Sequence, residues 1–252
     1  MEEIHYLLGN SCKLNCDFCF WDIRMPDTTL EFKKKIVDKI IQANIKKVTI
    51  SGGEPSENPN FLEILEHMHK NNLETIVHTN GLSITDKIAE KMANYTSRVS
   101  LTLDGFDKEV LSLMRKDYNI TNHTLHLIKL FQNLNTPTNI KTLVTKINKN
   151  EIPKIGDTLK SFPIQYWSLL EFIPINRGNA NKDKFYISPL EFDTIYEETK
   201  NKFPGLEIRK RRFTDKEKDY CFIAPDGGLY TYLKDKGDIL IGNIQTTNLN
   251  SL

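Results

Sequence analysis

The sequence has 252 residues, with 34 lysines and arginines against 33 aspartates and glutamates and a formal net charge of +1. A chain of this length can bury a large core, and we interpret it as one catalytic domain with a C-terminal extension. The balanced charge argues against a chain-wide nucleic-acid interface. No apolar run approaches the length that crosses a bilayer, so we expect a soluble protein without nucleic-acid or membrane partners.

The N-terminal segment contains a predicted strand over residues 4–8, and a cysteine-rich loop follows it. Three of the four cysteines fall within eight residues of this loop: Cys12, Cys16 and Cys19. A loop with this spacing can point three sulfurs at one centre, and thiolates hold iron–sulfur clusters and zinc. A disulfide would leave one of the three unpaired, and zinc would need His5 or Cys221 as a fourth ligand. A [4Fe-4S] cluster on three cysteines leaves one iron open to a ligand.

Helices and strands alternate after the cysteine loop. Thr28 is the predicted N-cap of the first helix, with Glu31 completing a capping box. Strands are expected at 47–50, 75–79, 98–103, 139–144 and 166–170, and helices at 61–68, 84–93, 108–115 and 123–134. This alternation predicts an α/β fold with a parallel sheet and crossover helices. About six such units precede residue 175, which favours a partial (β/α)6 TIM-like barrel over a closed eight-fold one.

Two predicted strands end in motifs that suit a binding site. The first motif is Ser51, Gly52, Gly53, Glu54 and Pro55. Its glycines allow a close backbone approach or a positive φ that side chains would block. Asn80 follows the next strand, and its amide both donates and accepts hydrogen bonds, as a ribose hydroxyl requires; Asn-Gly is equally a turn signal. Ligand sites of α/β barrels lie at this end of the strands.

The pattern changes near residue 180. We therefore divide the chain into residues 1–180, a partial barrel with an N-terminal cluster loop, and residues 181–252, a short α+β C-terminal extension that packs on the barrel. Ser188, Pro189 and Glu191 predict the start of a helix, as N-cap, first position and capping-box partner. Short strands are expected around 206–208, 220–223, 229–232 and 239–241.

The two N-terminal motifs together resemble those of the radical S-adenosylmethionine (SAM) superfamily. The resemblance rests on the Cys-x3-Cys-x2-Cys spacing with Phe18 before the last cysteine, followed by the Ser-Gly-Gly-Glu-Pro stretch. It implies an enzyme with a six-unit partial barrel and a [4Fe-4S] cluster on Cys12, Cys16 and Cys19. In this family SAM chelates the open iron, and its reductive cleavage yields a 5'-deoxyadenosyl radical that takes a hydrogen atom from a substrate. The resemblance also implies a flavodoxin- or ferredoxin-type electron donor, and the oxygen-labile cluster favours the cytoplasm.

The resemblance also assigns SAM contacts. The glycine stretch is expected to bind the SAM amino group, with Glu54 near a cation. Leu101–Gly105 and Arg115 are similar to a Ser-Leu-Asp-Gly stretch and arginine of peptide-modifying members, so Thr102 and Arg115 are assigned to the ribose and the carboxylate. The full set is Phe18, Ser51, Gly52, Gly53, Glu54, Pro55, Asn80, Thr102, Arg115, Leu143 and Val144. The alternative for Arg115 is a position on the surface of a helix. Leu143 and Val144 are assigned to the adenine, and the alternative for both is a position in the core of a buried strand.

The C-terminal stretches 221–230 and 241–244 look like remnants of the SPASM or twitch extension of peptide-modifying members. One cysteine cannot hold an auxiliary cluster of the ordinary kind, so we predict a single cluster. Cys221 is a candidate catalytic residue that donates a hydrogen atom to a substrate radical, as in peptide epimerases of the superfamily; the alternative is a buried structural cysteine. Arg177, in a turn after the sixth predicted strand, is a candidate for substrate or SAM contact.

Three functions remain open at the level of the sequence, beside activation of a glycyl-radical enzyme, which fits the chain length and a single cluster but has no supporting motif. The first is hydrogen abstraction from a peptide or another small molecule. The second is viperin-like conversion of a nucleoside triphosphate, because residues 16–20 and 106–110 resemble the corresponding stretches of viperin. Against it, viperin-like proteins carry basic residues on the late strands to hold the triphosphate. At those positions this chain has residues 141–142 and 166–168, which mostly lack such cations. The third is a non-catalytic sensor that binds SAM or a cluster.

Overall fold

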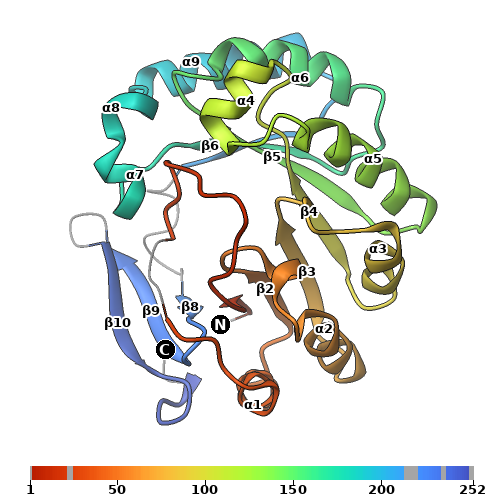
Figure 1. The fold of residues 1–252 in the computed structure, drawn as a ribbon, viewed down its shortest axis with the longest axis vertical. Coiled ribbons are helices and arrows are strands. Elements are labelled where there is room, and N and C mark those ends of the chain that lie inside the picture. Colours follow the sequence, from red (N-terminus) through yellow and green to blue (C-terminus); the bar gives the residue numbers. More distant parts are fainter. Residues whose placement is uncertain (1, 22–24, 213–220, 234–236, 250–252) are drawn as a thin grey trace.

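The computed structural model describes residues 2–21, 25–212, 221–233 and 237–249. Within these residues ten strands form one sheet, in the order β10-β9-β8-β1-β2-β3-β4-β5-β6-β7. The strands are β1 (Glu3–Leu7), β2 (Lys47–Ser51), β3 (Glu74–Thr79), β4 (Arg98–Thr102), β5 (Thr138–Val144), β6 (Trp167–Glu171), β7 (Ile208–Arg211), β8 (Cys221–Ile223), β9 (Gly228–Leu233) and β10 (Gly237–Asn243). The sheet curves around a central space (Figure 1).

Helices cover the outer, convex face of this sheet (Figure 1). They are α1 (Leu30–Gln42), α2 (Phe61–Lys70), α3 (Asp86–Ala93), α5 (Ile120–Asn133), α6 (Ile152–Leu159) and α9 (Pro189–Lys202). The shorter helices α4 (Lys108–Arg115), α7 (Asn176–Ala180) and α8 (Lys182–Phe185) pack against the cysteine loop instead. The main core lies between sheet and helices and includes Ile4, Val48, Val77, Val99, Ile140 and Trp167 from strands and Ile36, Ile64, Leu127 and Phe131 from helices. None of the helices in the described segments is long and apolar enough to cross a membrane.

The pairing of the strands confirms the predicted α/β fold with a partial, open barrel. Strands β1 to β7 pair in parallel along the sheet, as crossover helices require, and β8 pairs in parallel with β1. Strands β9 and β10 add an antiparallel hairpin beyond β8. The segment after residue 181 therefore contributes strands to both edges of the sheet. The proposed division at residue 180 stays a prediction.

Two helix starts show where local signals succeed and fail. Ser188 is the N-cap of α9, and its hydroxyl accepts the N–H of Glu191, as predicted. The predicted cap of α1 is wrong by one residue, because Thr29 accepts the N–H of Phe32 at 3.2 Å. The hydroxyl of Thr28 instead donates to the carbonyl of Pro225 at 3.2 Å. A contact with a residue almost two hundred positions away in the chain thus occupies Thr28, and the adjacent Thr29 caps the helix.

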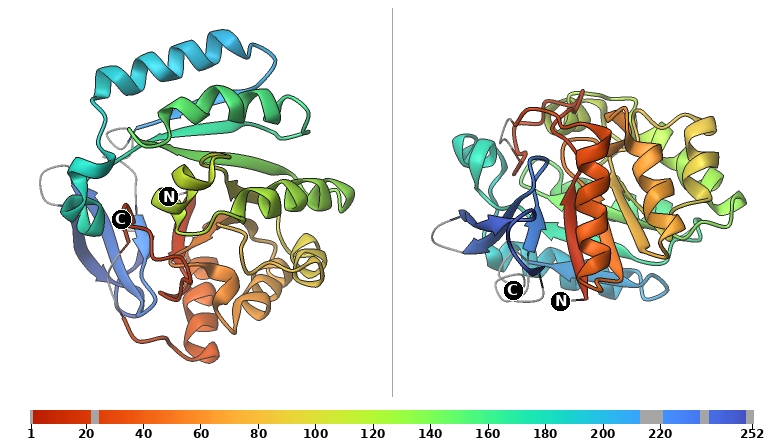
Figure 2. Two further views of the ribbon diagram at one scale, coloured as in Figure 1. Left: turned by 45° about the horizontal axis from the view of Figure 1, so that its top comes forward. Right: turned by 90° about the horizontal axis from the view of Figure 1, so that it is seen from below.

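The alternation of side chains along each strand separates two chemical environments. One set of positions faces the helices and is apolar, while the other faces the central space and includes His5, His78 and Lys141. The loop between β1 and α1 crosses the carboxyl ends of the strands, at the end opposite to the start of β1 (Figure 2, right). The sheet therefore presents polar side chains beneath the cysteine loop.

Candidate functional site

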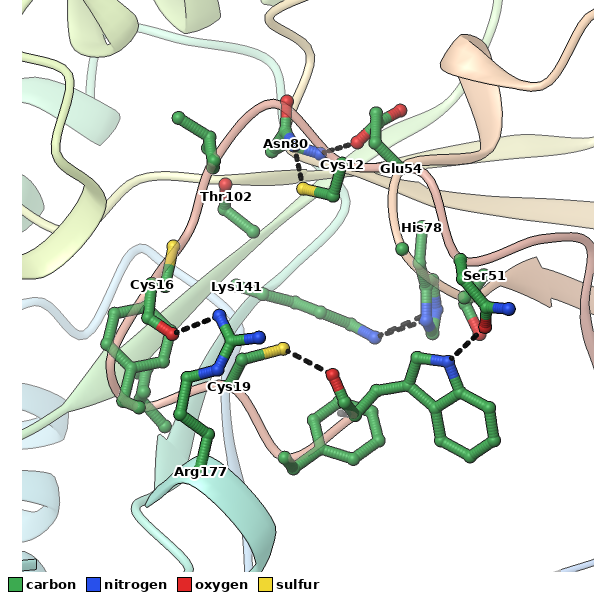
Figure 3. A pocket seen from close by; sticks show the side chains of 18 of the residues that line it. Cys12, Cys16, Cys19, Ser51, Glu54, His78, Asn80, Thr102, Lys141 and Arg177 are labelled. Carbon is green, nitrogen blue, oxygen red and sulfur yellow. Dashed lines mark hydrogen bonds between the residues drawn. The ribbon is translucent and has the colours of Figure 1, made fainter. Parts of the chain in front are cut away.

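A cavity of about 680 Å³ lies between the cysteine loop and the inner face of the sheet. Its wall is formed by the loop after β1, the turn after β2, the carboxyl ends of β3 to β6 and residues of the C-terminal strands. Figure 3 shows the loop passing around this space, with side chains from the strands pointing into it. The cavity thus occupies the end of the sheet where the sequence placed the ligand.

The three clustered cysteines all line the cavity. Cys16 is buried, Cys12 is exposed, and Cys19 lies between these extremes. Burial raises the pKa of Cys12 to about 12 and also raises the pKa of Cys19. These thiols are therefore protonated at neutral pH unless a metal centre replaces their protons. Figure 3 shows the three side chains spread along the loop around one space.

The donor set fits a cluster better than a single ion. Among the residues that the structure describes, His, Cys, Asp and Glu form no group of three or more that would hold one metal ion. Two sulfurs on one tetrahedral zinc are about 3.8 Å apart, whereas the cysteines of a four-iron cluster bind different irons and lie farther apart. Three thiols on one short loop, spread around a cavity, match the second arrangement.

The glycines after β2 bring the cysteine loop close to the sheet. Gly52 has φ +126°, and a Cβ atom there would lie 2.5 Å from the carbonyl oxygen of Gly9. A Cβ atom on Gly53 would lie 2.3 Å from the carbonyl oxygen of Ser11. The Gly53 N–H donates to the Gly9 carbonyl at 2.9 Å, and the Glu54 N–H donates to the Ser11 carbonyl at 2.7 Å. The positive φ was predicted, but the approaching group is the backbone of the cysteine loop.

Glu54 joins the glycine turn to the end of β3. Its buried carboxylate accepts the hydroxyl of Thr79 at 2.6 Å and the N–H of Asn80 at 2.7 Å. Burial raises the pKa of Glu54, while hydrogen bonds from Ser56 and Thr79 oppose the shift. In the described part of the chain these partners are hydroxyls and amides. The cation expected near Glu54 stays a prediction. Glu54 therefore positions the strand ends that surround the cavity.

Asn80 and Thr102 present polar atoms to the cavity. The Asn80 side chain donates from Nδ2 to Sγ of Cys12 at 3.7 Å and accepts the N–H of Leu82 at 2.8 Å. The hydroxyl of Thr102 is buried and has no hydrogen-bond partner among the described residues. Buried polar groups are normally hydrogen-bonded, so an orphaned hydroxyl on a cavity wall indicates a ligand or water site. Its chemistry fits the ribose assigned to it.

Arg115 belongs to the site and is not a surface residue of α4. Its Nε donates to Oδ2 of Asp104 at 2.5 Å, and its guanidinium lies 4.8 Å from the centre of the Phe18 ring. Its Nη1 lies 4.0 Å from Sγ of Cys16. The aspartate, the ring and the cysteine fix the orientation of the guanidinium at the cavity wall.

The floor of the cavity is formed by charged and titratable side chains that sequence reasoning did not assign. They are His5, His78, Lys141, Glu171 and Asp238. Nζ of Lys141 lies 2.8 Å from Nε2 of His78, and Figure 3 shows Lys141 extended across the cavity toward this ring. Strand alternation near the carboxyl ends of β3 and β5 is the signal that identifies the two residues. The register of Asp238 on β10 has no comparable sequence signal.

Three predicted site residues lie elsewhere. Val144 is fully buried in the core on the helix side of the sheet, while its neighbour Leu143 lines the cavity. Pro55 is buried in a short 3-10 turn that packs behind the glycine stretch. Cys221 is buried in the main core, and burial raises its pKa to about 11. The structure does not bring Cys221 to the cavity, and its surroundings agree with a structural cysteine.

The remaining predicted residues are brought together. Phe18, Ser51, Gly52, Gly53, Glu54, Asn80, Thr102, Arg115 and Leu143 line the same cavity as the three cysteines. Arg177 also lines it, and its guanidinium donates to the side chain of Asn15 and to the Cys16 carbonyl, the latter at 3.5 Å. Residues from four strand ends and the loop therefore converge on one space.

Comparisons with known proteins agree with this geometry. The sequence model of the Radical SAM superfamily matches residues 6–159. An S-adenosylmethionine-dependent nucleotide dehydratase of Flammeovirga pacifica is 24% identical over 248 residues, covering 91% of this chain and 82% of that protein. An AdoMet-dependent heme synthase of Methanosarcina barkeri is 26% identical over 197 residues, covering 76% of this chain and 56% of that protein.

Solved structures show the same fold at low sequence identity. Streptococcus suis SuiB bound to the precursor peptide SuiA has a TM-score of 0.82 at 16% identity, with 99% of this chain covering 64% of that chain. The enzyme anSMEcpe with bound AdoMet and the Cp18Cys peptide has a TM-score of 0.73 at 20% identity, with 98% of this chain covering 78% of that chain. The chain thus spans slightly less than two thirds of the length of SuiB and about three quarters of the length of anSMEcpe.

Proposed function

Because the chain belongs to the radical SAM superfamily, whose members are enzymes that use a [4Fe-4S] cluster and SAM, we propose that Cys12, Cys16 and Cys19 bind this cluster. When bound, the cluster and SAM supply a 5'-deoxyadenosyl radical that abstracts a hydrogen atom from a substrate. The observation that carries the proposal is the convergence of the cysteine loop, the glycine turn and the strand ends on one cavity.

The chain's own residues would orient SAM in this cavity. The free hydroxyl of Thr102 is assigned to a ribose hydroxyl, and Leu143 offers apolar surface to the adenine. Arg115 is assigned to the carboxylate, because a guanidinium held by Asp104 keeps further N–H donors for a second anion. Asn80 and the glycine turn complete the polar wall. The side chains of Arg115 and Asn80 are held by hydrogen bonds before any ligand arrives, which lowers the entropic cost of binding.

The first substrate class is a peptide or another small molecule. Two features support a peptide. The C-terminal strands beside the cavity lie largely within the stretches that resemble the extension of peptide-modifying members. The fold also matches SuiB and anSMEcpe, whose structures contain peptides. The aromatic ring of Phe20 is 47% exposed beside the cavity and offers a contact for an apolar side chain. A low-potential one-electron carrier would serve as the donor.

The second substrate class is a nucleoside triphosphate. The position of Lys141 favours it, because this ammonium group reaches the cavity floor beside His78. A triphosphate requires several cations or amides, and the guanidinium of Arg177 also lines the wall. The nucleotide dehydratase of Flammeovirga pacifica supports the same class. Glu171 and Asp238 on the floor oppose it by charge.

The proposal is tested on anaerobically reconstituted protein. We expect about four irons and about four sulfides per chain, and release of 5'-deoxyadenosine after reduction in the presence of SAM. Candidate peptides and CTP are then added separately, and the class that stimulates release identifies the substrate. Bound zinc, or a four-iron cluster that never cleaves SAM with any candidate, would contradict the enzymatic proposal and leave the sensor.

A further inference from the structure

Two N–H groups point at the sulfurs of the cysteine loop. Nδ2 of Asn80 lies 3.7 Å from Sγ of Cys12, and Nη1 of Arg115 lies 4.0 Å from Sγ of Cys16. We infer that Asn80 and Arg115 set the reduction potential of the cluster by hydrogen bonding to these two sulfurs. The inference rests on the proposed function, because it requires the cluster to bind at the three cysteines.

The physical basis is the charge that the cluster gains. Reduction of [4Fe-4S] from the 2+ to the 1+ state adds one electron, taken from a low-potential one-electron donor, and part of that charge resides on the cysteine sulfurs. Hydrogen bonds and positive charge near the sulfurs stabilise the reduced state more than the oxidised state. Each such group therefore raises the potential and makes reduction easier.

Arg115 is held in place for this role by the fold. The Asp104 carboxylate that binds it is 1% exposed and also accepts the N–H of Leu143 at 2.9 Å. The Phe18 ring covers the guanidinium from one side. With a side chain only 13% exposed, Arg115 cannot turn to solvent, and its charge is poorly screened by water. The positive end of the Asp104–Arg115 pair faces Cys16.

The orientation of the Asn80 amide is fixed by a different set of bonds. Its backbone N–H donates to Glu54, and its Oδ1 accepts the N–H of Leu82. Because Oδ1 is occupied by a donor, the NH2 group is the one that faces Cys12. Cys19 differs from the other two cysteines, since its Sγ lies 3.1 Å from the carbonyl oxygen of Trp21. The three sulfurs are therefore electrostatically unequal.

Other charges near the loop are more exposed. Asp17 pairs with Lys116 at 2.6 Å and with Lys184 at 2.8 Å, and the two lysine side chains are 42% and 36% exposed. Solvent and the counter-charge of Asp17 weaken their effect on the cluster. Arg177 binds the loop through Asn15 and the Cys16 carbonyl, and its positive charge acts on Cys19, the third cysteine of the loop. Lys116, the residue after Arg115, is a matched control of the same charge.

The test is a redox titration of the reconstituted full chain before SAM is added, followed by electron paramagnetic resonance of the reduced cluster. Arg115→Met should lower the ratio of reduced to oxidised cluster at a fixed potential by about tenfold, which corresponds to about 59 mV for one electron. Asn80→Asp keeps an acceptor for Leu82 but replaces the donor with a negative charge, so it should also lower the ratio. Arg115→Lys should restore most of the potential, and Lys116→Met should change it much less.

The outcomes separate this inference from the proposed function. A wild-type chain that fails to assemble about four irons would overturn the proposed function itself. A cluster that assembles normally, with Arg115→Met shifted no more than Lys116→Met, would overturn the inference alone. If Arg115→Met does not assemble a cluster, Asn80→Asp decides: an unchanged potential contradicts the inference, and a lowered potential supports it.

Discussion

The rim and the floor of the cavity are built in different ways. The rim consists of the cysteine loop and the glycine turn, which are bound to each other through backbone hydrogen bonds. The floor consists of His5, His78, Lys141, Glu171 and Asp238, single side chains from five different strands or strand ends. Chemistry shared by a superfamily requires a fixed backbone geometry at the rim. Substrate choice requires side chains that can change while the strands remain, and under the proposed function the floor residues are the candidates for this role.

The most damaging change to the rim is the loss of a cluster ligand. Cys16→Ala should reduce the iron content and bring 5'-deoxyadenosine release below about 1% of the wild-type value, because three thiolates are needed to hold the cluster. Iron analysis and product chromatography measure both effects.

Cys221→Ala is the matched control for this change. It should keep the full iron content and lose about 1 kcal/mol of stability, because Cys221 packs in the core. If Cys221→Ala retained deoxyadenosine release but lost turnover of the substrate, the sequence-based role as hydrogen donor would be restored.

The backbone contact between the glycine turn and the cysteine loop predicts the next largest effect. Gly53→Ala places a Cβ atom 2.3 Å from the Ser11 carbonyl, so the loop must move. We expect a loss of about 1–3 kcal/mol in unfolding free energy, together with reduced iron binding. Gly205→Ala is the control, because nothing lies within 4 Å of its Cβ position. Equal denaturation midpoints for the two variants would argue against a rim specified by backbone contact.

On the floor, Lys141→Met should affect substrate use and leave the rim intact. Loss of one charged contact to an anionic substrate should lower substrate-stimulated deoxyadenosine release by about 10- to 100-fold at limiting substrate. Iron content and the release seen without substrate should not change. Lys160→Met removes the same charge from the surface, where it pairs with Asp157, and serves as control. Equal losses of substrate-stimulated deoxyadenosine release in Lys141→Met and Lys160→Met would contradict a role of Lys141 in substrate binding.

The smallest predicted effect concerns Asp238. Burial raises the pKa of its carboxyl, opposed by a hydrogen bond from Asn176. The folded protein therefore retains this proton at a pH where the unfolded chain has released it. The contribution of Asp238 to stability must then fall as the pH rises from about 4 through the folded-state pKa. Across this pH range the unfolding free energy of Asp238→Asn should decline less than that of the wild type. Parallel pH profiles of the two proteins would contradict a raised pKa of Asp238.

Most of the rim was predictable from the sequence. The cysteine spacing and the Ser-Gly-Gly-Glu-Pro stretch identify a loop and a turn whose chemistry depends on residue type. Thr102 and Arg115 were located through a short motif, and both line the cavity. Sequence reasoning assigned Leu143 and Val144 together, although adjacent residues of a strand face opposite sides and only one can reach the cavity.

The floor was not predictable to the same degree. His78 and Lys141 are 63 residues apart, and only the parallel register through β4 brings them together. Asp238 depends on the pairing and register of the antiparallel hairpin beyond β8, which the short strands predicted at 229–232 and 239–241 do not specify. In the same way, the Pro225 contact moved the cap of α1 from Thr28 to Thr29.

The sequence by itself determined the family, the parallel α/β architecture, the cysteine loop and the glycine turn. Each carries a local pattern of residue types and spacings, which can be identified without knowing the distant contacts that the segment makes. The tertiary structure alone decided which residues of different strands meet in the cavity, which groups face Cys12 and Cys16, and where the C-terminal hairpin joins the wall. These features depend on register and packing between distant segments, and that information is distributed over the whole chain.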